Sequence, residues 1–275
     1  MDHDLIISRW NADIYERQET QTDDVQYLLE GFLAKSSYST ISSNSCPLDT
    51  LGSTPPRILE LACGGGRILA PLAEAGYIID GVDLDDAMLD KCRARIADMP
   101  GATCRRANAL TDDLGTGYDV VLLAANLLLN ITADMPSAQA QRLLIARAAA
   151  CLAPGGRLFV DFDCTAGFAT GDNPAERVIF SGTDSHGVTG TYSLYDAHND
   201  GPTRTSTFTR RFALTTPDGE RITREQESTT HFPSLGEVMA WLAEAGVVVE
   251  SMFSGYSGNP ITQTTRRATI WATKP

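Results

Sequence analysis

The sequence predicts a doubly wound α/β fold, with a mostly parallel seven-stranded sheet and an antiparallel β insertion. From Arg57 to Asp163, short apolar runs alternate with helical patterns, which is the order typical of βαβ units around a parallel sheet. After Asp163 the pattern changes to runs rich in Thr, Tyr, Phe and Val, broken by Asn-Asp-Gly and Pro-Asp-Gly turns, as in antiparallel hairpins.

The N-terminal region has helical spacing of apolar residues between Leu5 and Leu33, interrupted by a polar stretch, and predicts two short helices. Residues 36–56 are rich in Ser, Thr and Pro and predict a loop or linker. We therefore expect residues 1–56 to form cap helices and a linker, ahead of a core over residues 57–163.

The core has five expected strands separated by helical patterns, and its last helix ends in Ala-Pro-Gly-Gly, a helix stop followed by a tight turn. The strands are Ile58–Ala62, Ile78–Val82, Thr103–Ala107, Tyr118–Ala125 and Arg157–Asp163, and the helices are Arg67–Ala75, Ala87–Asp98 and Ser137–Leu152.

Residues 164–233 are expected to form a β-rich insertion that covers the substrate, with four strands at Arg177–Ser181, Val188–Asp196, Thr203–Thr216 and Arg221–Ser228. Residues 234–275 then return to the main sheet. Ser234 and Glu237 form the capping box of a helix over Ser234–Ala245, and two last strands follow at Val247–Phe253 and Arg267–Thr273.

Bulk properties restrict the class of partner. A chain of 275 residues with 43% hydrophobic residues can bury one large core, and its net charge of -13 disfavours nucleic acid and anionic membranes. The Arg-rich stretch from Arg204 to Arg224 is either a local basic groove or, as we favour, a set of solvated strand faces. With no export signal, membrane span or paired cysteine motif, we expect a cytoplasmic protein with reduced thiols and no metal.

A glycine loop follows the first core strand, in Glu60-Leu61-Ala62-Cys63-Gly64-Gly65-Gly66-Arg67. Glycine lets the backbone turn sharply and lets a ligand approach closely. A nicotinamide dinucleotide site would need a small residue where this chain has Leu69. A P-loop that binds nucleotide phosphates would need a lysine after its last glycine, and this loop has none. Both of these alternatives are therefore disfavoured.

Polar residues follow three further strands. Asp83 lies at the tip of the second strand, where a carboxylate can accept hydrogen bonds from both ribose hydroxyls. Asn108 and Ala109 follow the third strand, where an amide oxygen can accept from an adenine amino group, and Tyr118 opens the fourth. These strand ends meet at one edge of a parallel sheet.

Over residues 57–163 the sequence resembles the class I S-adenosylmethionine-dependent methyltransferases, through E-L-A-C-G-G-G-R, G-V-D-L-D-D-A-M-L, Y-D-V-V-L-L-A-A-N and L-A-P-G-G-R-L-F-V-D-F in the family's order. The resemblance implies a Rossmann-like methyltransferase fold, S-adenosyl-L-methionine as cofactor and S-adenosyl-L-homocysteine as product. A nicotinamide-dependent oxidoreductase and a non-catalytic member of the fold remain alternatives.

The resemblance also implies the cofactor-binding residues. Glu60, Ala62, Gly64 and Gly66 are expected beside the methionine part, Asp83 at the ribose, and Leu84, Met88, Asn108, Ala109 and Ala124 around the adenine and the methyl group. Arg67 is either a cofactor residue or a surface arginine at a helix N-terminus. Tyr15 and Arg17 of the N-terminal helix match residues that reach the cofactor's carboxylate, although the helix can equally serve to pack Trp10 and Ile14 on the sheet.

Methyl transfer is an in-line displacement that requires no obligatory catalytic motif. The acceptor is expected to be a small molecule, methylated on N or O. Asn126 and Asn130 are expected to end the fourth strand near the methyl group, with helix capping as the alternative. His186 and His231 are candidate bases, and Tyr192 and Tyr195 are candidate orienting hydroxyls, all on one inner face of the insertion.

Overall fold

The computed structural model describes residues 2–33, 55–164, 168 and 170–275, in two compact units. The smaller unit comprises residues 1–20 and 167–232, and the larger comprises 21–166 and 233–275. The division at Thr20 differs from the expected domain 1–56, because the two N-terminal helices belong to different units. Most of the expected linker 36–56, and Cys46, lie outside the described residues.

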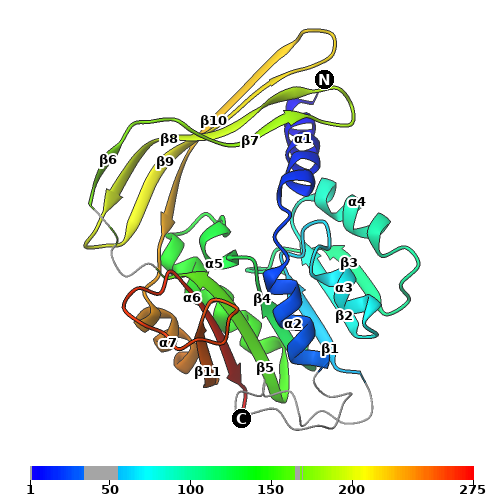
Figure 1. Ribbon diagram of the computed structural model, residues 1–275, viewed down its shortest axis with the longest axis vertical. Helices are drawn as coiled ribbons and strands as arrows, with labels where there is room; N and C mark the ends of the chain where they lie inside the picture. The colour runs from blue at the N-terminus through cyan, green and yellow to red at the C-terminus, as the bar shows by residue number, and fades with distance from the viewer. Residues whose placement is uncertain (1, 34–54, 165–167, 169) are drawn as a thin grey trace. The chain divides into compact units, whose positions relative to one another are not determined.

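The larger unit is built on a seven-stranded sheet with the order β11-β12-β5-β4-β1-β2-β3 (Figure 1). The strands are β1 (Arg57–Leu61), β2 (Ile78–Asp83), β3 (Ala102–Arg106), β4 (Tyr118–Leu123), β5 (Leu152–Asp163), β11 (Val248–Ser254) and β12 (Arg267–Thr273). Strands β1 to β5 are parallel, whereas β12 runs antiparallel to β5 and to β11. The predicted fold class is confirmed, and the strand order reverses between β1 and β4, where ligands bind in such sheets.

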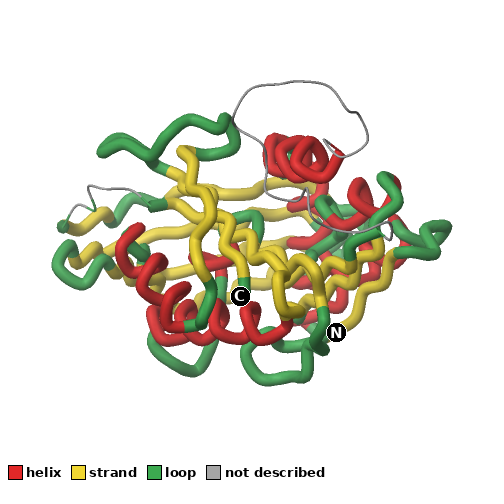
Figure 2. Tube along the Cα trace, turned by 90° about the horizontal axis from the view of Figure 1, so that it is seen from below, coloured by secondary structure: helices red, strands yellow, loops and turns green. Residues whose placement is uncertain are grey.

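Helices cover both faces of this sheet (Figure 2). Helices α6 (Ser137–Cys151) and α7 (Leu235–Glu244) enclose one core, and α2 (Asp23–Leu33), α3 (Leu69–Glu74) and α4 (Asp86–Arg95) enclose the other. Alternate residues of β1 divide between the cores, with Leu59 and Leu61 in the first and Ile58 in the second. Glu60 therefore faces the α2, α3 and α4 side.

The smaller unit is an antiparallel sheet packed on α1 (His3–Gln18). Its strands are β6 (Gly171–Asn173), β7 (Arg177–Thr183), β8 (Thr189–Asp200), β9 (Thr205–Thr215) and β10 (Arg221–His231). Trp10 of α1 is fully buried, packs edge-on against Phe212 and donates to the Gly182 carbonyl at 3.2 Å. The predicted hairpins are confirmed, whereas the short β6 was not predicted.

Most element boundaries follow local sequence closely, with two exceptions. The capping box of Ser234 and Glu237 is present, and Asp85 caps α4 through the Ala87 and Met88 amides. The first exception is β5, which begins at Leu152 and not at Arg157, so the Ala-Pro-Gly-Gly expected to form a tight turn belongs to the strand. The expected strand Tyr118–Ala125 ends at Leu123, after which Ala125 and Asn126 adopt left-handed backbone angles and Leu127–Asn130 form α5. Asn126 and Asn130 therefore do not end a strand, which corrects the prediction.

Among the described residues, no helix is both long enough and apolar enough to cross a membrane. The five described cysteines, Cys63, Cys92, Cys104, Cys151 and Cys164, are free thiols.

Candidate active site

The loop after β1 uses its glycines for two different reasons. Ala62, Gly64 and Gly66 all have positive φ values, of 58°, 53° and 80°. A Cβ on Gly64 would meet nothing within 4 Å, so the backbone there borders open space. A Cβ on Gly66 would lie 2.9 Å from the Cys92 Sγ, so Gly66 is required by packing of the loop on α4. Of these two glycines, Gly64 is the one that leaves room for a ligand.

Asp83 ties the end of β2 to this loop. Its Oδ2 accepts a hydrogen bond from the Gly64 amide at 2.8 Å, and its Oδ1 accepts one from the Asp85 amide at 2.9 Å. A carboxylate has about four lone-pair sites, so each oxygen can still accept from a ligand hydroxyl. The backbone donors fix the orientation of the carboxylate.

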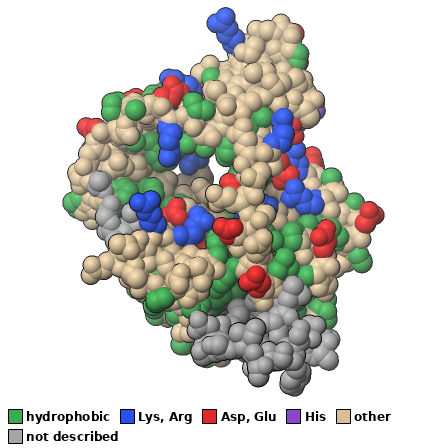
Figure 3. Space-filling model, viewed as in Figure 1, with side chains coloured by type: hydrophobic (Ala, Val, Ile, Leu, Met, Phe, Trp, Pro, Cys, Tyr) green, Lys and Arg blue, Asp and Glu red, His purple; other side chains and the backbone are tan. Residues whose placement is uncertain are grey.

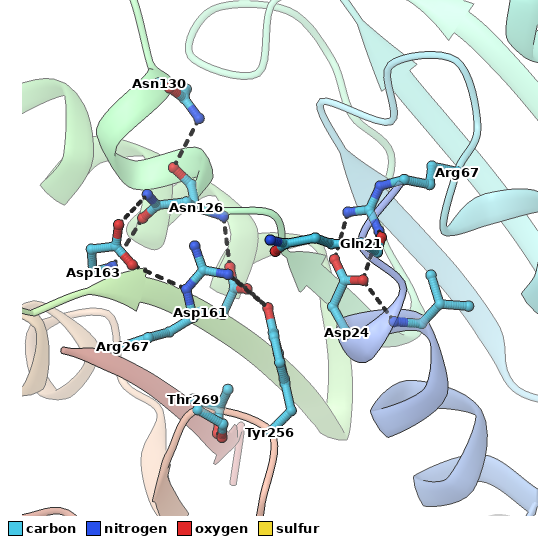
Figure 4. Close-up of polar contacts among 12 residues, drawn as sticks. Gln21, Asp24, Arg67, Asn126, Asn130, Asp161, Asp163, Tyr256, Arg267 and Thr269 are labelled. Carbon is cyan, nitrogen blue, oxygen red and sulfur yellow. Dashed lines mark hydrogen bonds and ion pairs between the residues drawn. The ribbon is translucent and has the colours of Figure 1, made fainter. Parts of the chain in front are cut away.

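Arg67 fastens α2 to the glycine loop. Its guanidinium makes a two-pronged contact with Asp24, at 2.6 and 2.5 Å, and donates to the Gln21 carbonyl at 2.8 Å (Figure 4). Asp24 is only 5% exposed. Arg67 is thus no surface arginine, and its contacts among the described residues are those of a residue that positions the loop.

Glu60 is a buried acid without a full set of partners. It is 4% exposed, and its Oε2 has no hydrogen-bond partner among the described residues. Burial is the main reason that its pKa is raised well above the usual value, with Cys92 adding to the effect and Arg67 opposing it. A ligand cation beside Glu60 would supply the missing partner.

The expected adenine side of the site contains both exposed and occupied groups. Leu84 is 48% exposed, and Met88 is partly buried on α4. The Asn108 Oδ1 already accepts from the Leu110 amide at 2.9 Å, and the Ala109 carbonyl accepts from Arg147 at 2.7 Å. If Asn108 accepts a hydrogen bond from the adenine amino group, it must therefore use the remaining lone pair of that oxygen.

The turn between β4 and α5 is clamped by β5. Ala124 is buried, and the left-handed Asn126 donates its amide to the Asp161 Oδ1 at 2.8 Å. The Asn126 side chain exchanges two hydrogen bonds with Asp163, of 3.0 and 2.9 Å, while Asn130 reaches only the Asn126 carbonyl, at 3.4 Å (Figure 4). These bonds maintain a strained turn at the edge of the sheet where ligands bind.

Two residues far along the chain complete this cluster, and sequence reasoning missed both. The Tyr256 hydroxyl donates to Asp161, and Arg267 donates to the Asp163 Oδ1 at 3.0 Å. Asp161 is fully buried and burial raises its pKa, whereas Asp163 keeps a side chain 41% exposed. The sequence did contain one signal for such partners: Asp161 is a carboxylate inside the apolar run Leu158–Phe162, and a buried carboxylate needs hydrogen-bond partners.

Tyr15 and Arg17 lie in the smaller unit and make contacts there. The Tyr15 ring packs edge-on against Phe180 at 5.8 Å. Arg17 donates to the Thr183 carbonyl at 2.7 Å and to Asp13 at 3.3 Å. Trp10 and Ile14 pack on the second sheet. The cofactor role of Tyr15 and Arg17 stays a prediction.

The four candidates on the insertion do not share one face, which corrects that prediction. Tyr192 stacks on Phe212 at 4.6 Å on the α1 side of the sheet, whereas Tyr195 lies under the Arg211 guanidinium, at 4.3 Å, on the opposite side. The two tyrosines are three positions apart on β8, so their side chains point to opposite faces of the sheet.

The two histidines of the insertion differ in environment. His186 is exposed and contacts the Ser185 hydroxyl at 3.3 Å. His231 is 4% exposed, with its Nδ1 3.1 Å from the Thr203 carbonyl. Their catalytic role stays a prediction.

Two arginines of the Arg-rich stretch are paired with acids of the same unit. Arg211 contacts Glu225 at 2.7 Å and Glu176 at 3.4 Å, and Arg224 contacts Asp4. On the face drawn in Figure 3, several basic side chains lie next to acidic ones. This pairing favours solvated strand faces over a basic groove.

The site geometry defines a class of protein. A doubly wound sheet with a glycine loop after β1 and an acid at the end of β2 is the architecture that binds adenosine-containing cofactors. Residues 59–158 match the family model described as "Methyltransferase domain". The α/β core therefore contains a methyltransferase domain over residues 59–158.

Solved structures share the fold over nearly the whole chain. The CcbJ methyltransferase from Streptomyces caelestis is 20% identical, with a TM-score of 0.64 over 93% of this chain and 97% of that one. The sugar N-methyltransferase KedS8 from Streptoalloteichus is 18% identical, with a TM-score of 0.63 over 100% and 93%. CalS10 from Micromonospora echinaspora, an amino pentose methyltransferase solved with S-adenosylmethionine bound, is 20% identical, with a TM-score of 0.60 over 94% and 93%. A comparison with curated proteins found no match in sequence.

Proposed function

We propose that this protein transfers the methyl group of S-adenosylmethionine to an amino nitrogen of a small, sugar-like acceptor. The observation that carries the cofactor assignment is the Asp83 carboxylate, held by the Gly64 and Asp85 amides at the reversal point of the sheet. The acceptor class is suggested by the activities named for KedS8 and CalS10.

The residues present fit this cofactor. Asp83 would accept from the ribose hydroxyls, and the unpartnered Oε2 of Glu60 would accept from the ammonium of the methionine part. Exposed Leu84 offers an apolar surface to adenine, and the open space at Gly64 admits the ligand beside the backbone. When bound, the cofactor supplies an electrophilic methyl carbon on a sulfonium.

The protein's own residues hold the acceptor in line and control its proton. The amine must attack through its lone pair, so it has to be uncharged at nitrogen when the new N–C bond forms and the S–C bond breaks. Asp163 is the partly exposed carboxylate of the cluster, and Asn126 and Arg267 fix its orientation. We assign Asp163 to bind the acceptor amine and to accept its proton, directly or through water.

Two measurements test the proposed function. Calorimetry should show that S-adenosylhomocysteine binds and that NAD does not, and transfer of isotopically labelled methyl should occur to amino sugars but not to their hydroxyl analogues. Asp83→Ala should weaken S-adenosylhomocysteine binding, whereas Asp86→Ala, at an exposed position three residues further on, is the matched control and should not. Binding of NAD alone would favour an oxidoreductase, and product binding without transfer to any small molecule would favour a non-catalytic member of the fold.

A further inference from the structure

The smaller unit contains a cavity that none of the preceding chemistry uses. It has a volume of about 200 Å³ and is lined by residues of α1, β7, β8, β9 and β10. We propose that this cavity, here called the aryl pocket, binds a small aromatic monocarboxylate. The proposal is independent of methyl transfer, because every lining residue lies within the smaller unit.

Aromatic rings form one wall of the aryl pocket. Strand register places Phe180, Tyr192 and Phe212 side by side across β7, β8 and β9. Tyr192 stacks on Phe212 with centroids 4.6 Å apart and on Phe180 at 6.1 Å. Stacked rings present flat π surfaces, and another planar ring packs on these by an offset or edge-on contact.

Cationic and amide groups lie beside these rings on the same face of the sheet. Arg210 and Gln226 are directly paired across β9 and β10, next to the pair formed by Phe212 and Arg224. The Arg210 Nε is buried and has no hydrogen-bond partner among the described residues. Leaving a buried donor unpaired is unfavourable, so a ligand oxygen at this point would be stabilising.

Charge and size together select the ligand class. The described lining residues include no carboxylate, but Arg224 is already paired with Asp4, which leaves the positive charge of Arg210 uncompensated. One carboxylate balances that charge, whereas the second charge of a phosphate monoester would remain unpaired in the pocket. A cavity of about 200 Å³ is smaller than the pockets that hold drug-sized ligands, so a single ring fits it better than a larger aromatic system.

The first experiment uses the full chain and four probes, with binding followed by ligand-observed NMR titration. Benzoate should bind at least about tenfold more tightly than benzamide, which lacks the charge, and than cyclohexanecarboxylate, which lacks the planar ring. Phenyl phosphate should also bind more weakly than benzoate. Equal affinities for benzoate and benzamide, tighter binding of phenyl phosphate, or no benzoate binding up to about 10 mM would overturn the proposal.

The second experiment locates the site. Arg210→Gln should weaken benzoate binding about tenfold or more, and Phe212→Leu should weaken it several-fold, whereas Arg221→Gln, at an exposed position outside the pocket, should not change it. Photolabelling with 4-azidobenzoate should modify peptides within residues 178–227 in the parent protein, which decides the case even where a variant fails to fold. Labelling confined to residues 57–163, or unchanged binding in folded Arg210→Gln, would refute the site.

Discussion

Glu60→Gln should make the free protein more stable and bind the cofactor less well. The substitution keeps the shape of the side chain and removes its charge. Glu60 is 4% exposed and one of its oxygens has no partner among the described residues. Gln leaves an unpaired polar group at the same place but removes the charge, and a buried charged group is less stable than a neutral one, so Gln should raise the free energy of unfolding at neutral pH by about 1–3 kcal/mol.

The stability difference between Glu60→Gln and the parent should change with pH, whereas a difference caused by packing alone would not. Burial raises the pKa of Glu60 in the folded protein, so the folded state binds its proton more tightly than the unfolded state does. That contribution to stability is fully present below the pKa of Glu in the unfolded chain, which is about 4.3. It is lost as the pH rises through the pKa of Glu60 in the folded protein. The advantage of Gln over Glu should therefore be near zero in acid and grow toward neutral pH.

Denaturant unfolding of both proteins across this pH range measures the effect, and calorimetry with S-adenosylhomocysteine measures binding. Loss of the charged partner for the ligand ammonium should weaken affinity about tenfold or more. Glu74→Gln, at an exposed position of α3, is the control and should change neither quantity. A Glu60→Gln protein that is less stable than the parent at pH 7, or that binds the product equally well, would refute the reasoning.

Four further outcomes are expected. Asp83→Ala should reduce S-adenosylhomocysteine affinity by about 1–3 kcal/mol in calorimetry, and affinity within a factor of two of the parent would contradict its assignment. Arg67→Lys should lower the thermal midpoint, because an ammonium cannot reproduce the two-pronged contact with α2. Tyr256→Phe should impair turnover more than product binding, since its hydroxyl supports the clamped turn through a buried acid; equal losses in both would argue against this. His186→Ala and His231→Ala should leave cofactor binding intact, with slower methyl transfer in at least one, and full activity in both would leave the insertion without a catalytic histidine.

The proximity of the glycine loop and Asp83 was predictable because its determinants are local in sequence. The glycine loop follows a buried strand directly, and Asp83 follows the next strand, so parallel topology alone brings them to one edge. The hydrogen bond between the Gly64 amide and Asp83 shows that the loop and the strand end are in direct contact. The role of Gly66 was not predictable, since it depends on contact with Cys92 of α4.

The acceptor half was less predictable because it depends on pairing between distant segments. The apolar run after Tyr118 reads as one strand, but the backbone turns left-handed at Ala125 and Asn126 because β5 supplies partners for the turn. Tyr256 and Arg267 join this cluster only through the antiparallel pairing of the last strands. The face of the insertion on which each tyrosine lies likewise required the strand register.

Electrostatics at the reversal point of the sheet favours a cationic cofactor. Glu60, Asp24 and Asp83 influence one another there, and Arg67 is the cation that opposes them most directly, so the free site carries an excess of negative charge. A nicotinamide dinucleotide would bring a pyrophosphate with two negative charges to this loop. Two like unit charges about 4 Å apart repel by about 4 kcal/mol at an effective dielectric constant of 20, so this negative site would disfavour the pyrophosphate. S-adenosylmethionine carries a sulfonium, an ammonium and one carboxylate, and is therefore a net cation. Burial is the main reason that the pKa of Glu60 is raised in the free protein, and Asp24 and Asp83 add to that effect. An ammonium bound beside Glu60 should lower this pKa again, so cofactor binding should be linked to proton release, which calorimetry in buffers of different ionisation enthalpy would detect.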